Sequence, residues 1–447
     1  MRGTRARILM LTFEYGPIRC GGLATLVTAL CRAIDLERFE PVVVLPRSGC
    51  SPPWPRVERR SLTYCEADIY RDGGCEVWLL SNPVLDSAAI YPEPLVHASI
   101  KKTDEYGERV ADLLGELRVD LVHLHDAYGY KCLYEARRLG LPSLLTVHRL
   151  HEDEPPLAFA ELATSRLVDE VSTVSHSYLR EREDFFRFRH RTHVVPNGID
   201  TTFWNEELLP REPGGRPARL RRLLQEFGLP ERPTFAYVGR LDGDQKGLDV
   251  LLEAYERHLR SAPVNLLVVG EGERALAERL AAAAASGENL RFIHRQYAPE
   301  EVRALLGAVD FILIPSRYEP FGLIQLEAMA MGALPIVSRV GGLRDVIVDL
   351  GREGGFGRSF EAGSAEELAS SVQEMTRLAW SAPEVLTRAR HAARTGVASW
   401  SAATMARRYE ELYRAMLGAG TAPEEGLSSM QAGHLPACQL EGARPWR

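Results

Sequence analysis

Two glutamates, Glu319 and Glu327, lie eight positions apart in the stretch SRYEPFGLIQLEAMAMG (316–332), with a glycine between them. The proline after Glu319 favours an extended or turn conformation, and the apolar positions that follow fit one face of a helix. The backbone N–H groups of Gly322 and Leu323 would then be free at a helix N-terminus, where the helix dipole favours an anion. Because carboxylates beside a phosphate repel it unless they bind hydroxyl groups, the spacing favours a ligand with hydroxyl groups on both sides of a diphosphate, as in a nucleotide sugar. A structural alternative stays open, in which Glu319 stabilises a loop and Glu327 lies on an exposed helix face.

Two cations, Arg240 and Lys246, lie in the glycine-rich turn of VGRLDGDQKGLDVLLEAYE, between a predicted strand and a predicted helix. Two cations in such a turn can hold a diphosphate and neutralise the negative charge that develops on it as a leaving group. Lys246 is one of only four lysines among 54 basic residues, which makes its retention informative. Arg240 could instead be an ordinary surface residue.

A glycine turn follows the first predicted strand, where YGPIRCGGLATLVTAL places Gly21 and Gly22 at the start of a helix with Arg19 beside them. Glycines there let a ligand approach the backbone closely, although such a turn has other uses. A further turn, VGEGE, carries Gly270 and Gly272. It does not match G-x-G-x-x-G, and no acidic partner for a ribose follows at the expected spacing, which disfavours a nicotinamide-dependent enzyme.

The segments VHLHDAYG and LLTVHRLHE contribute His123, His125, Asp126 and His148, near the ends of two predicted strands. On a strand, His123 and His125 share one face, which suggests a metal site. No third ligand stands at a recognisable spacing, so the favoured interpretation is that they are polar residues at the rim of a cleft. His148 could be a hydrogen-bonded structural histidine, but its position at the carboxyl end of a strand favours a role in a site.

Buried apolar runs alternate with amphipathic helical stretches along two parts of the chain, which predicts an α/β fold with two doubly wound parallel sheets. Such folds bind ligands at the carboxyl ends of their strands, so we expect a central cleft between two domains. At 447 residues the chain exceeds one ordinary core. The composition predicts an N-terminal domain at 1–205, a polar linker at 206–232, a C-terminal domain at 233–398, a final helix at 399–417 and a disordered tail at 418–447.

Composition excludes several classes of function. The 45% hydrophobic and 26% charged content is typical of a soluble globular protein, and a net charge of -7 gives no basic footprint for nucleic acid. No stretch approaches the ~20 apolar residues of a membrane span, and the first apolar run is too short for a signal peptide, so we expect a cytoplasmic protein without a membrane partner. The seven cysteines are scattered without a C-x-x-C pair, which indicates neither a disulfide framework nor a zinc site.

Together, the motifs EPFGLIQLEAMAMG, GRLDGDQKGLDVLLEA, PNGIDTTFWNE, RCGGLA, HLHD, TVH and VGGLRDVI resemble those of the glycogen and starch synthases, in particular their shorter prokaryotic form. These enzymes are retaining glycosyltransferases of the GT-B fold, with two Rossmann-like domains that face a central cleft. The resemblance runs from residue 7 to about residue 417. The two glutamates alone would indicate retaining glycosyltransferases in general, whereas G-G-L-A, the Q-K-G turn and G-G-L-x-D point to the synthases.

The resemblance implies roles for the residues of a donor site in the C-terminal domain. Glu319 matches the family's first glutamate, which approaches the hexose of the donor, and Glu327 matches the second, which is associated with the ribose hydroxyls. Arg240 and Lys246 match the pair that grips the diphosphate, and Gly22 matches the loop that meets it from the other, acceptor-side domain. The predicted donor-binding residues are Arg19, Gly21, Gly22, Arg240, Lys246, Gly322, Leu323 and Glu327.

The resemblance also places His148 and Asp126 near the reacting centre and makes the final helix the one that crosses back to the first domain, as part of the hinge. Three positions depart from the family: Arg19 replaces a lysine, Thr25 replaces an acidic residue and Phe321 replaces a cysteine. Arginine is not equivalent to lysine at an anion site. The predicted catalytic residues are Glu319, His148, Arg240, Lys246 and Asp126.

We therefore expect a glycogen synthase that transfers glucose, with retention of configuration, from ADP- or UDP-glucose to the non-reducing end of an α-1,4-glucan. The favoured mechanism is a front-face substitution in which the departing phosphate accepts the acceptor's proton. A covalent intermediate is disfavoured, because Glu319 is devoted to hydroxyl binding. Two alternatives stay open: a related retaining GT-B transferase with a different acceptor, and a catalytically silent glucan-binding protein. No metal or cofactor is expected, the partners are the nucleotide sugar and the glucan, and homo-oligomerisation stays open.

Overall fold

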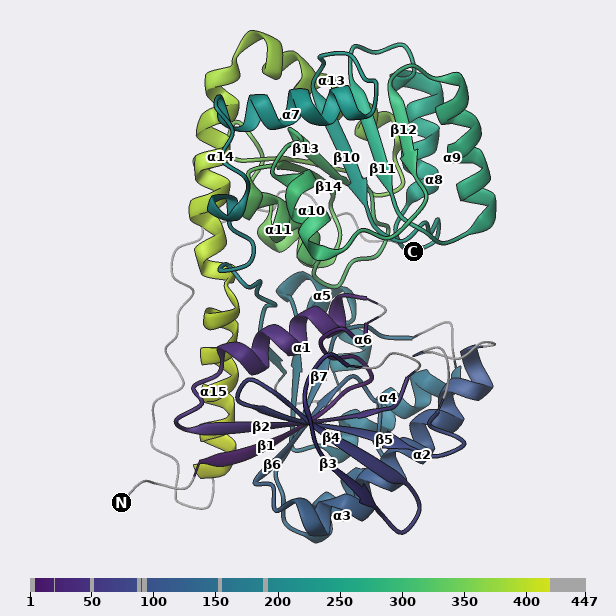
Figure 1. Cartoon of the computed structure of the whole chain (residues 1–447), viewed down its shortest axis with the longest axis vertical. Coiled ribbons are helices and arrows are strands. Elements are labelled where there is room, and N and C mark those ends of the chain that lie inside the picture. Colours follow the sequence, from purple (N-terminus) through teal and green to yellow (C-terminus); the bar gives the residue numbers. More distant parts are fainter. Residues whose placement is uncertain are drawn as a thin grey trace.

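The computed structural model describes residues 5–19, 21–48, 52–86, 90, 95–151, 155–187 and 192–418 of the chain. These residues form two α/β domains, one above the other in Figure 1, with a long helical segment running along both. Except for residue 418, the predicted tail at 418–447 lies outside the described residues.

In the described residues, a nine-stranded sheet forms the centre of the N-terminal domain, in the order β3-β4-β5-β2-β1-β6-β7-β8-β9. The run from β5 to β8 has the 3-2-1-4-5-6 order of a Rossmann-like sheet and is parallel, as predicted. The antiparallel pairs β3–β4 and β4–β5 are an addition to that pattern. The strands are β1 (Ala6–Leu11), β2 (Phe39–Pro46), β3 (Arg56–Ser61), β4 (Glu66–Asp72), β5 (Cys75–Ser81), β6 (Leu121–His125), β7 (Ser143–Val147), β8 (Glu170–Thr173) and β9 (His193–Val194).

Helices cover both faces of this sheet, and one of them comes from the far end of the described chain. Ile8 of β1 belongs to the core formed with α1 and α15, whereas its neighbour Leu9 belongs to the core formed with α2 and α3. Successive side chains of a strand point to opposite faces, so β1 contributes to both layers. The helices are α1 (Gly22–Ala33), α2 (Leu95–Leu117), α3 (Cys132–Arg138), α4 (Pro155–Leu167), α5 (His176–Glu181), α6 (Glu183–Phe186) and α15 (Ala402–Gly418).

The C-terminal domain has, within its described residues, a six-stranded parallel sheet in the order β12-β11-β10-β13-β14-β15. This is again the 3-2-1-4-5-6 order, so the prediction of two doubly wound domains is confirmed. The strands are β10 (Thr234–Val238), β11 (Asn265–Val269), β12 (Leu290–Ile293), β13 (Phe311–Ile314), β14 (Leu334–Ser338) and β15 (Arg358–Phe360).

The helices of the C-terminal domain pack in pairs, α8 against α13 and α11 against α14. No helix among the described residues is long and apolar enough to cross a membrane. The helices are α7 (Gly215–Glu226), α8 (Leu248–Ala254), α9 (Arg274–Ser286), α10 (Pro299–Leu306), α11 (Leu323–Met331), α12 (Gly341–Val346), α13 (Ala365–Ser381) and α14 (Pro383–Val397), with a π-helical turn at Tyr255–Leu259 and 3-10 turns at Glu206–Leu208 and Ala398–Trp400.

Residues 206–232, predicted to be a linker, contain helix α7, which is attached to the C-terminal domain. The guanidinium of Arg216 donates to the backbone carbonyl of Leu306 at 3.2 Å, and that of Arg219 donates to the carbonyl of Gly307 at 3.0 Å. Both carbonyls lie at the end of α10, where the helix dipole favours a cation. Two of the arginines that make this segment polar therefore bind the end of a helix.

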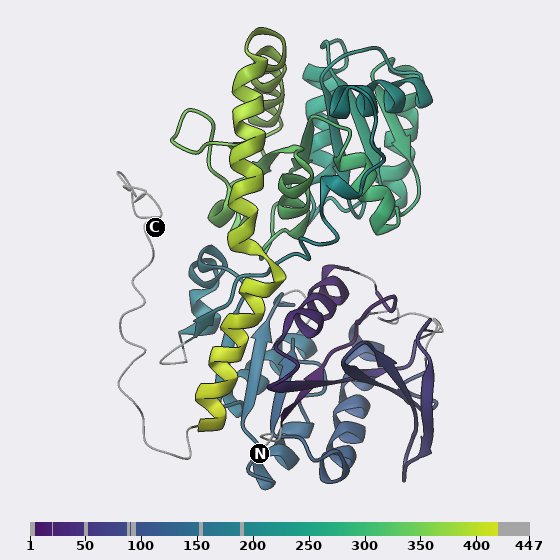
Figure 2. The same cartoon turned by 60° about the vertical axis from the view of Figure 1, so that its left-hand side comes forward.

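The chain passes between the domains twice, and the two passages lie side by side. The N–H of Ile199 donates to the carbonyl of Trp400 at 3.0 Å, and the N–H of Ala402 donates back to Ile199 at 2.7 Å. After this crossing, α15 lies along the N-terminal domain, as Figure 2 shows. The final helix therefore packs against the N-terminal domain, in contact with α1.

Candidate active site

Each sheet reverses its strand order at one point, between β1 and β6 in the N-terminal domain and between β10 and β13 in the C-terminal domain. Ligands of doubly wound sheets bind outside the carboxyl ends of the strands at such points. Most of the predicted site residues follow these strands: Arg19, Gly21 and Gly22 after β1, Asp126 after β6, Arg240 and Lys246 after β10, and Glu319, Gly322, Leu323 and Glu327 after β13, while His148 follows β7.

The segments after β10 and β13 meet in an ion pair. The Nζ of Lys246 lies 2.7 Å from Oε2 of Glu319, and the hydroxyl of Ser316 donates to the same oxygen at 3.2 Å. The glutamate side chain is 10% exposed and the lysine side chain 27%. The ammonium group has three N–H donors, so it can also bind phosphate oxygens.

Arg240 lies in the same loop as Lys246, with its side chain about half exposed. Its Nη2 lies 2.6 Å from Oε1 of Gln245 and 2.8 Å from Oδ2 of Asp242, and its carbonyl accepts a hydrogen bond from the hydroxyl of Tyr237 at 2.5 Å. The carbonyl of Gln245 accepts the N–H of Arg317 at 2.9 Å, which ties this loop to the segment after β13. Diphosphate oxygens could replace the carboxylate and amide partners of both cations.

Helix α11 begins after Gly322, whose φ of 93° lies in the left-handed region that favours glycine. In the part of the chain that the structure describes, no acceptor is found for the backbone N–H of Gly322 or Leu323, in agreement with the prediction of free amides. Two glycines of α12 let its backbone approach this turn. A Cβ atom at Gly341 would lie 1.9 Å from the carbonyl oxygen of Glu319, and the N–H of Gly342 donates to that oxygen at 3.1 Å.

Glu327 is half-buried one turn into α11. Burial raises the pKa of its carboxyl from 4.5 to about 8. A carboxyl with this pKa is mostly neutral at pH 7, so it does not repel an anion at the start of its helix.

The glycine turn after β1 faces α11 from the other domain. A Cβ atom added at Gly22 would lie 3.4 Å from Cδ1 of Leu323, so the two segments lie close together. The N–H of Gly21 donates to Oε2 of Glu14 at 2.9 Å, which holds the turn in place. Arg19 is exposed at the surface beside this turn. The structure therefore brings the predicted glycine turn and the predicted helix N-terminus together.

Asp126 holds the backbone that carries His148. Its φ of 60° is uncommon for a residue other than glycine, and its carboxylate accepts the N–H of His148 at 2.7 Å and that of Arg149 at 3.3 Å. Burial raises the pKa of Asp126 to about 7 and lowers the pKa of His148 to about 3. The imidazole of His148 is therefore neutral at pH 7, and the Asp126 carboxyl is engaged with the protein backbone.

His123 and His125 are fully buried, which corrects the interpretation that they lie at the rim of a cleft. His123 Nδ1 and Nε2 each lie 2.7 Å from a hydroxyl, that of Tyr413 on α15 and that of Thr146 on β7. His125 Nδ1 lies 3.0 Å from Nε2 of His148. Among the described residues, no group of three or more His, Cys, Asp and Glu side chains could hold a metal ion.

Contacts between α5 and the C-terminal domain support the segment that carries Glu319, and they were not predicted from the sequence. Ser175 is a recognisable helix cap, since it accepts the N–H of Tyr178 at 3.0 Å, but nothing in the sequence indicates its partner in the other domain. The contacts are Ser175 Oγ to the Pro320 carbonyl at 2.8 Å, Ser177 N–H to Asp345 Oδ2 at 3.0 Å and Gly341 N–H to Glu181 Oε1 at 3.0 Å.

Two family models match the chain, one in each domain. The model described as "Glycosyltransferase Family 4" matches residues 20–203, and the model described as "Glycosyl transferases group 1" matches residues 222–394. The border between them falls near the first passage between the domains.

The curated relatives include bacterial glycogen synthases. The chain is 30% identical over 488 residues to the glycogen synthase of Granulibacter bethesdensis, an alignment that covers 92% of this chain and 99% of that protein. It is 34% identical over 314 residues to that of Alkalilimnicola ehrlichii and 35% identical over 268 residues to that of Myxococcus xanthus. The chain spans only 64% and 54% of the lengths of these last two proteins.

Solved structures share the two-domain fold at low identity. The catalytic domain of starch synthase IV from Arabidopsis thaliana, bound to ADP and acarbose, matches with a TM-score of 0.78 and 18% identity, over 93% of this chain and 100% of that one. Sucrose-phosphate synthase from Thermosynechococcus elongatus matches with a TM-score of 0.71 and 20% identity, over the same shares. At these identities the likeness bears on the fold alone.

Proposed function

The chain belongs to the glycogen synthase family of GT-B glycosyltransferases, and from this we propose that it transfers glucose from ADP- or UDP-glucose to the non-reducing end of an α-1,4-glucan, with retention of configuration. The observation that carries the proposal is the ion pair between Lys246 and Glu319, at 2.7 Å, beside the free amides at the start of α11. A cation, a carboxylate and a helix N-terminus together suit a ligand with both a diphosphate and hydroxyl groups.

In this proposal each group has one task. Lys246, Arg240 and the α11 amides bind the diphosphate, Glu319 binds hydroxyls of the hexose, and Glu327 binds those of the ribose. When the bond between the anomeric carbon and the phosphate oxygen breaks, positive charge develops on the sugar ring and negative charge on the diphosphate. The cations and the helix N-terminus stabilise that negative charge.

The acceptor hydroxyl attacks the anomeric carbon on the face that the phosphate leaves, and its proton passes to the departing phosphate oxygen. The new glycosidic bond therefore forms as the sugar–phosphate bond breaks, without a covalent enzyme intermediate. His148, presented by Asp126 and His125, lies in the segment after β7 and supplies a neutral imidazole near the reacting sugar.

The first test of this function is release of nucleoside diphosphate. The protein is mixed with ADP-glucose or UDP-glucose, with and without glycogen, and release is followed in time. We expect release that depends on glycogen, and a loss of at least about 100-fold in Glu319→Ala and in Lys246→Ala, because each removes a preorganised charged contact. Unchanged turnover in both variants would remove the site assignment.

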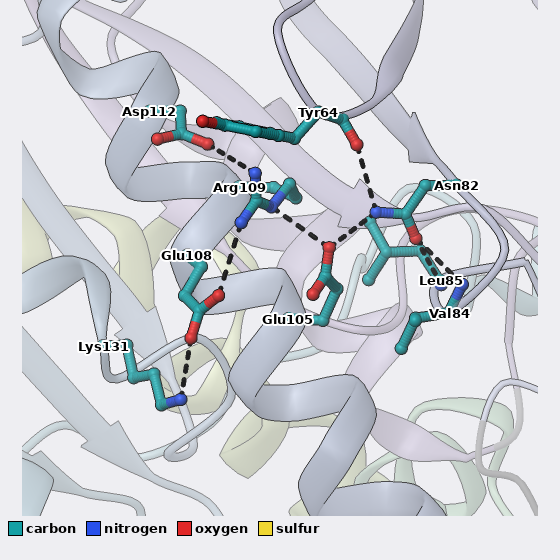
Figure 3. A network of polar contacts seen from close by, with 9 residues as sticks. All are labelled: Tyr64, Asn82, Val84, Leu85, Glu105, Glu108, Arg109, Asp112 and Lys131. Carbon is teal, nitrogen blue, oxygen red and sulfur yellow. Dashed lines mark hydrogen bonds and ion pairs between the residues drawn. The ribbon is translucent and has the colours of Figure 1, made fainter.

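Lys131 offers a matched control for Lys246. It forms an ion pair with Asp104 at 3.1 Å and another with Glu108 at 2.9 Å. Figure 3 shows the pair with Glu108 as part of a network on the N-terminal domain that also includes Arg109. An exposed pair of this kind contributes little to stability. Lys131→Ala removes the same ammonium group and should leave turnover at the wild-type rate.

The same assay separates the alternatives. A related transferase with a different acceptor would release diphosphate with another sugar and not with glycogen, and a silent glucan-binding protein would bind glycogen without release. We further propose that the protein is cytoplasmic. Analytical ultracentrifugation tests whether it forms a homo-oligomer.

A further inference from the structure

The imidazoles of His125 and His148 form a direct contact between two neighbouring strands. His125 is the last residue of β6, and His148 follows β7 directly. Nδ1 of His125 lies 3.0 Å from Nε2 of His148. His125 is fully buried and His148 is half-buried. The buried ring of His125 can therefore determine which nitrogen of His148 carries the proton.

Both rings are neutral, because burial lowers the pKa of His148 to about 3 and that of His125 well below its ordinary value. A neutral imidazole carries one proton, on one of its two nitrogens. The contact needs a single proton between the two nitrogens that meet. Only two arrangements therefore satisfy it, and they give His148 opposite tautomers.

The remaining nitrogen of His125 distinguishes these arrangements. Its Nε2 is buried and has no hydrogen-bond partner among the described residues. If His148 donated in the contact, His125 would carry its proton on Nε2, as a buried N–H without an acceptor. Such orphaned N–H groups are rarer in folded proteins than acceptors that lack a donor. The arrangement in which His125 donates from Nδ1 leaves only a bare nitrogen there.

We infer that His125 is a positioning residue, which donates from Nδ1 to Nε2 of His148 and thereby fixes His148 as the tautomer protonated on Nδ1. The nitrogen of His148 that points away from His125 is then a hydrogen-bond donor. A donor at this place can bind a hydroxyl or phosphate oxygen of the nucleotide sugar, whereas a bare nitrogen would be repelled by the phosphate. The binding of the nucleotide sugar by this donor rests on the proposed function, whereas the tautomer of His148 does not depend on it.

The tautomer is measured directly by NMR. The protein is labelled with 15N-histidine, and long-range 1H–15N spectra distinguish a protonated ring nitrogen from a bare one. His148→Gln assigns the His148 signals by their disappearance. We expect a protonated Nδ1 and a bare Nε2 for His148; the reverse pattern overturns the inference.

Two variants test whether His125 sets this state. The amide nitrogen of asparagine takes a position close to that of histidine Nδ1, so His125→Asn keeps a donor, whereas His125→Phe removes it. In His125→Phe we expect His148 to lose the single Nδ1–H form and kcat to fall by at least about tenfold, with KM changed less than ~2-fold. His125→Asn should restore both. A single Nδ1–H tautomer that persists in His125→Phe contradicts the inference.

Thr146→Val is the structural control in the same buried cluster. The backbone of Thr146 pairs with His125 between the strands and is unchanged in the variant, whereas its hydroxyl bonds to His123, Ser172 and Tyr409. Among the described residues, no hydrogen bond joins that hydroxyl to the ring of His125 or His148. Its loss should lower the melting temperature while leaving the His148 tautomer and kcat as in the wild type. If the wild type extends no glucan, the proposed function fails, and the NMR spectra alone still decide the inference.

Discussion

In the free protein, the carboxyl of Glu327 in α11 is mostly protonated at neutral pH. Its pKa of about 8 lies far above the ordinary 4.5, because the group is buried. Ribose hydroxyls that donate to this group would favour its ionised form and lower the pKa. Nucleotide binding should therefore release a proton near neutral pH.

The sign of the pH dependence follows from this shift. The free protein binds more protons than the complex between the pKa of the complex and about 8, so affinity for ADP or UDP should rise with pH in that window and level off above it. Calorimetric titrations in two buffers of different ionisation enthalpy count the released protons. Glu327→Gln should abolish both the release and the pH dependence, and a wild type that releases none would exclude this role for Glu327.

The pairing of Lys246 with Glu319 could be anticipated from the sequence, because both follow parallel strands and the carboxyl ends of such strands meet at one edge. The task of Asp126 could not. Its carboxylate accepts the backbone N–H of His148, just after β7. This contact depends on a left-handed backbone conformation at Asp126 that no sequence pattern specifies. The orientation of His125 likewise depends on strand register.

Helix α5 contacts α12, which in turn packs against the segment that carries Glu319. The hydroxyl of Ser177 donates to Oδ1 of Asp345 and its N–H to Oδ2, and Gly341 of the same helix approaches the Glu319 carbonyl. A hydrogen bond to a charged group contributes about 1.5–3 kcal/mol. Ser177→Ala should therefore lower the melting temperature by several degrees and kcat/KM for the donor by about threefold to tenfold, because the Glu319 segment loses support.

Ser371→Ala is the matched control. Its hydroxyl donates to the carbonyl of Glu367 at 2.8 Å within α13, so the variant removes the same group without touching the contact between domains. Thermal unfolding and donor saturation kinetics of the two variants should differ. Equal kinetics would show that the α5 contacts bear only on stability.

Strands and helices can be predicted from the sequence where their burial produces a continuous or periodic run of apolar residues, and not where they are exposed or polar. The run FILI of β13 is fully buried under helices on both faces, and such runs are visible in the sequence. Strand β3, with the sequence RVERRS, is exposed throughout and carries no alternation. The polar composition of 206–232 predicts a linker, but the structure has helix α7 there. In the sequence, arginines that bind helix-end carbonyls, as Arg216 and Arg219 do, look the same as arginines exposed to solvent.

The two domains are joined where the chain crosses itself, and Gly198 allows the crossing. A Cβ atom at this position would lie 2.3 Å from the carbonyl oxygen of Ser401, far inside van der Waals contact. Gly198→Ala must therefore shift one passage against the other, at a cost of about 2 kcal/mol. We expect a lower melting temperature and a lower kcat, since the proposed site is formed by residues of both domains.

Gly396→Ala provides a control of opposite sign. Gly396 lies inside α14, where a Cβ atom would lie 3.9 Å from Cε of Met329, an ordinary van der Waals distance. An alanine there should raise stability by roughly 0.5–1 kcal/mol and leave kcat unchanged. A fall in stability of the same size in both variants would mean that the close approach of residue 198 to the Ser401 carbonyl does not cause the loss.

The docking of α15 also bears on synthesis by the ribosome. Tyr409 and Tyr413 are fully buried against the first sheet, where their hydroxyls bond to Thr146 and His123. Domains usually fold in the order in which they are translated. Here α15 covers part of one face of the first domain's sheet, but it is translated after the whole second domain. In a growing chain, the apolar surface under α15 therefore stays accessible to chaperones until residues 402–418 emerge from the exit tunnel.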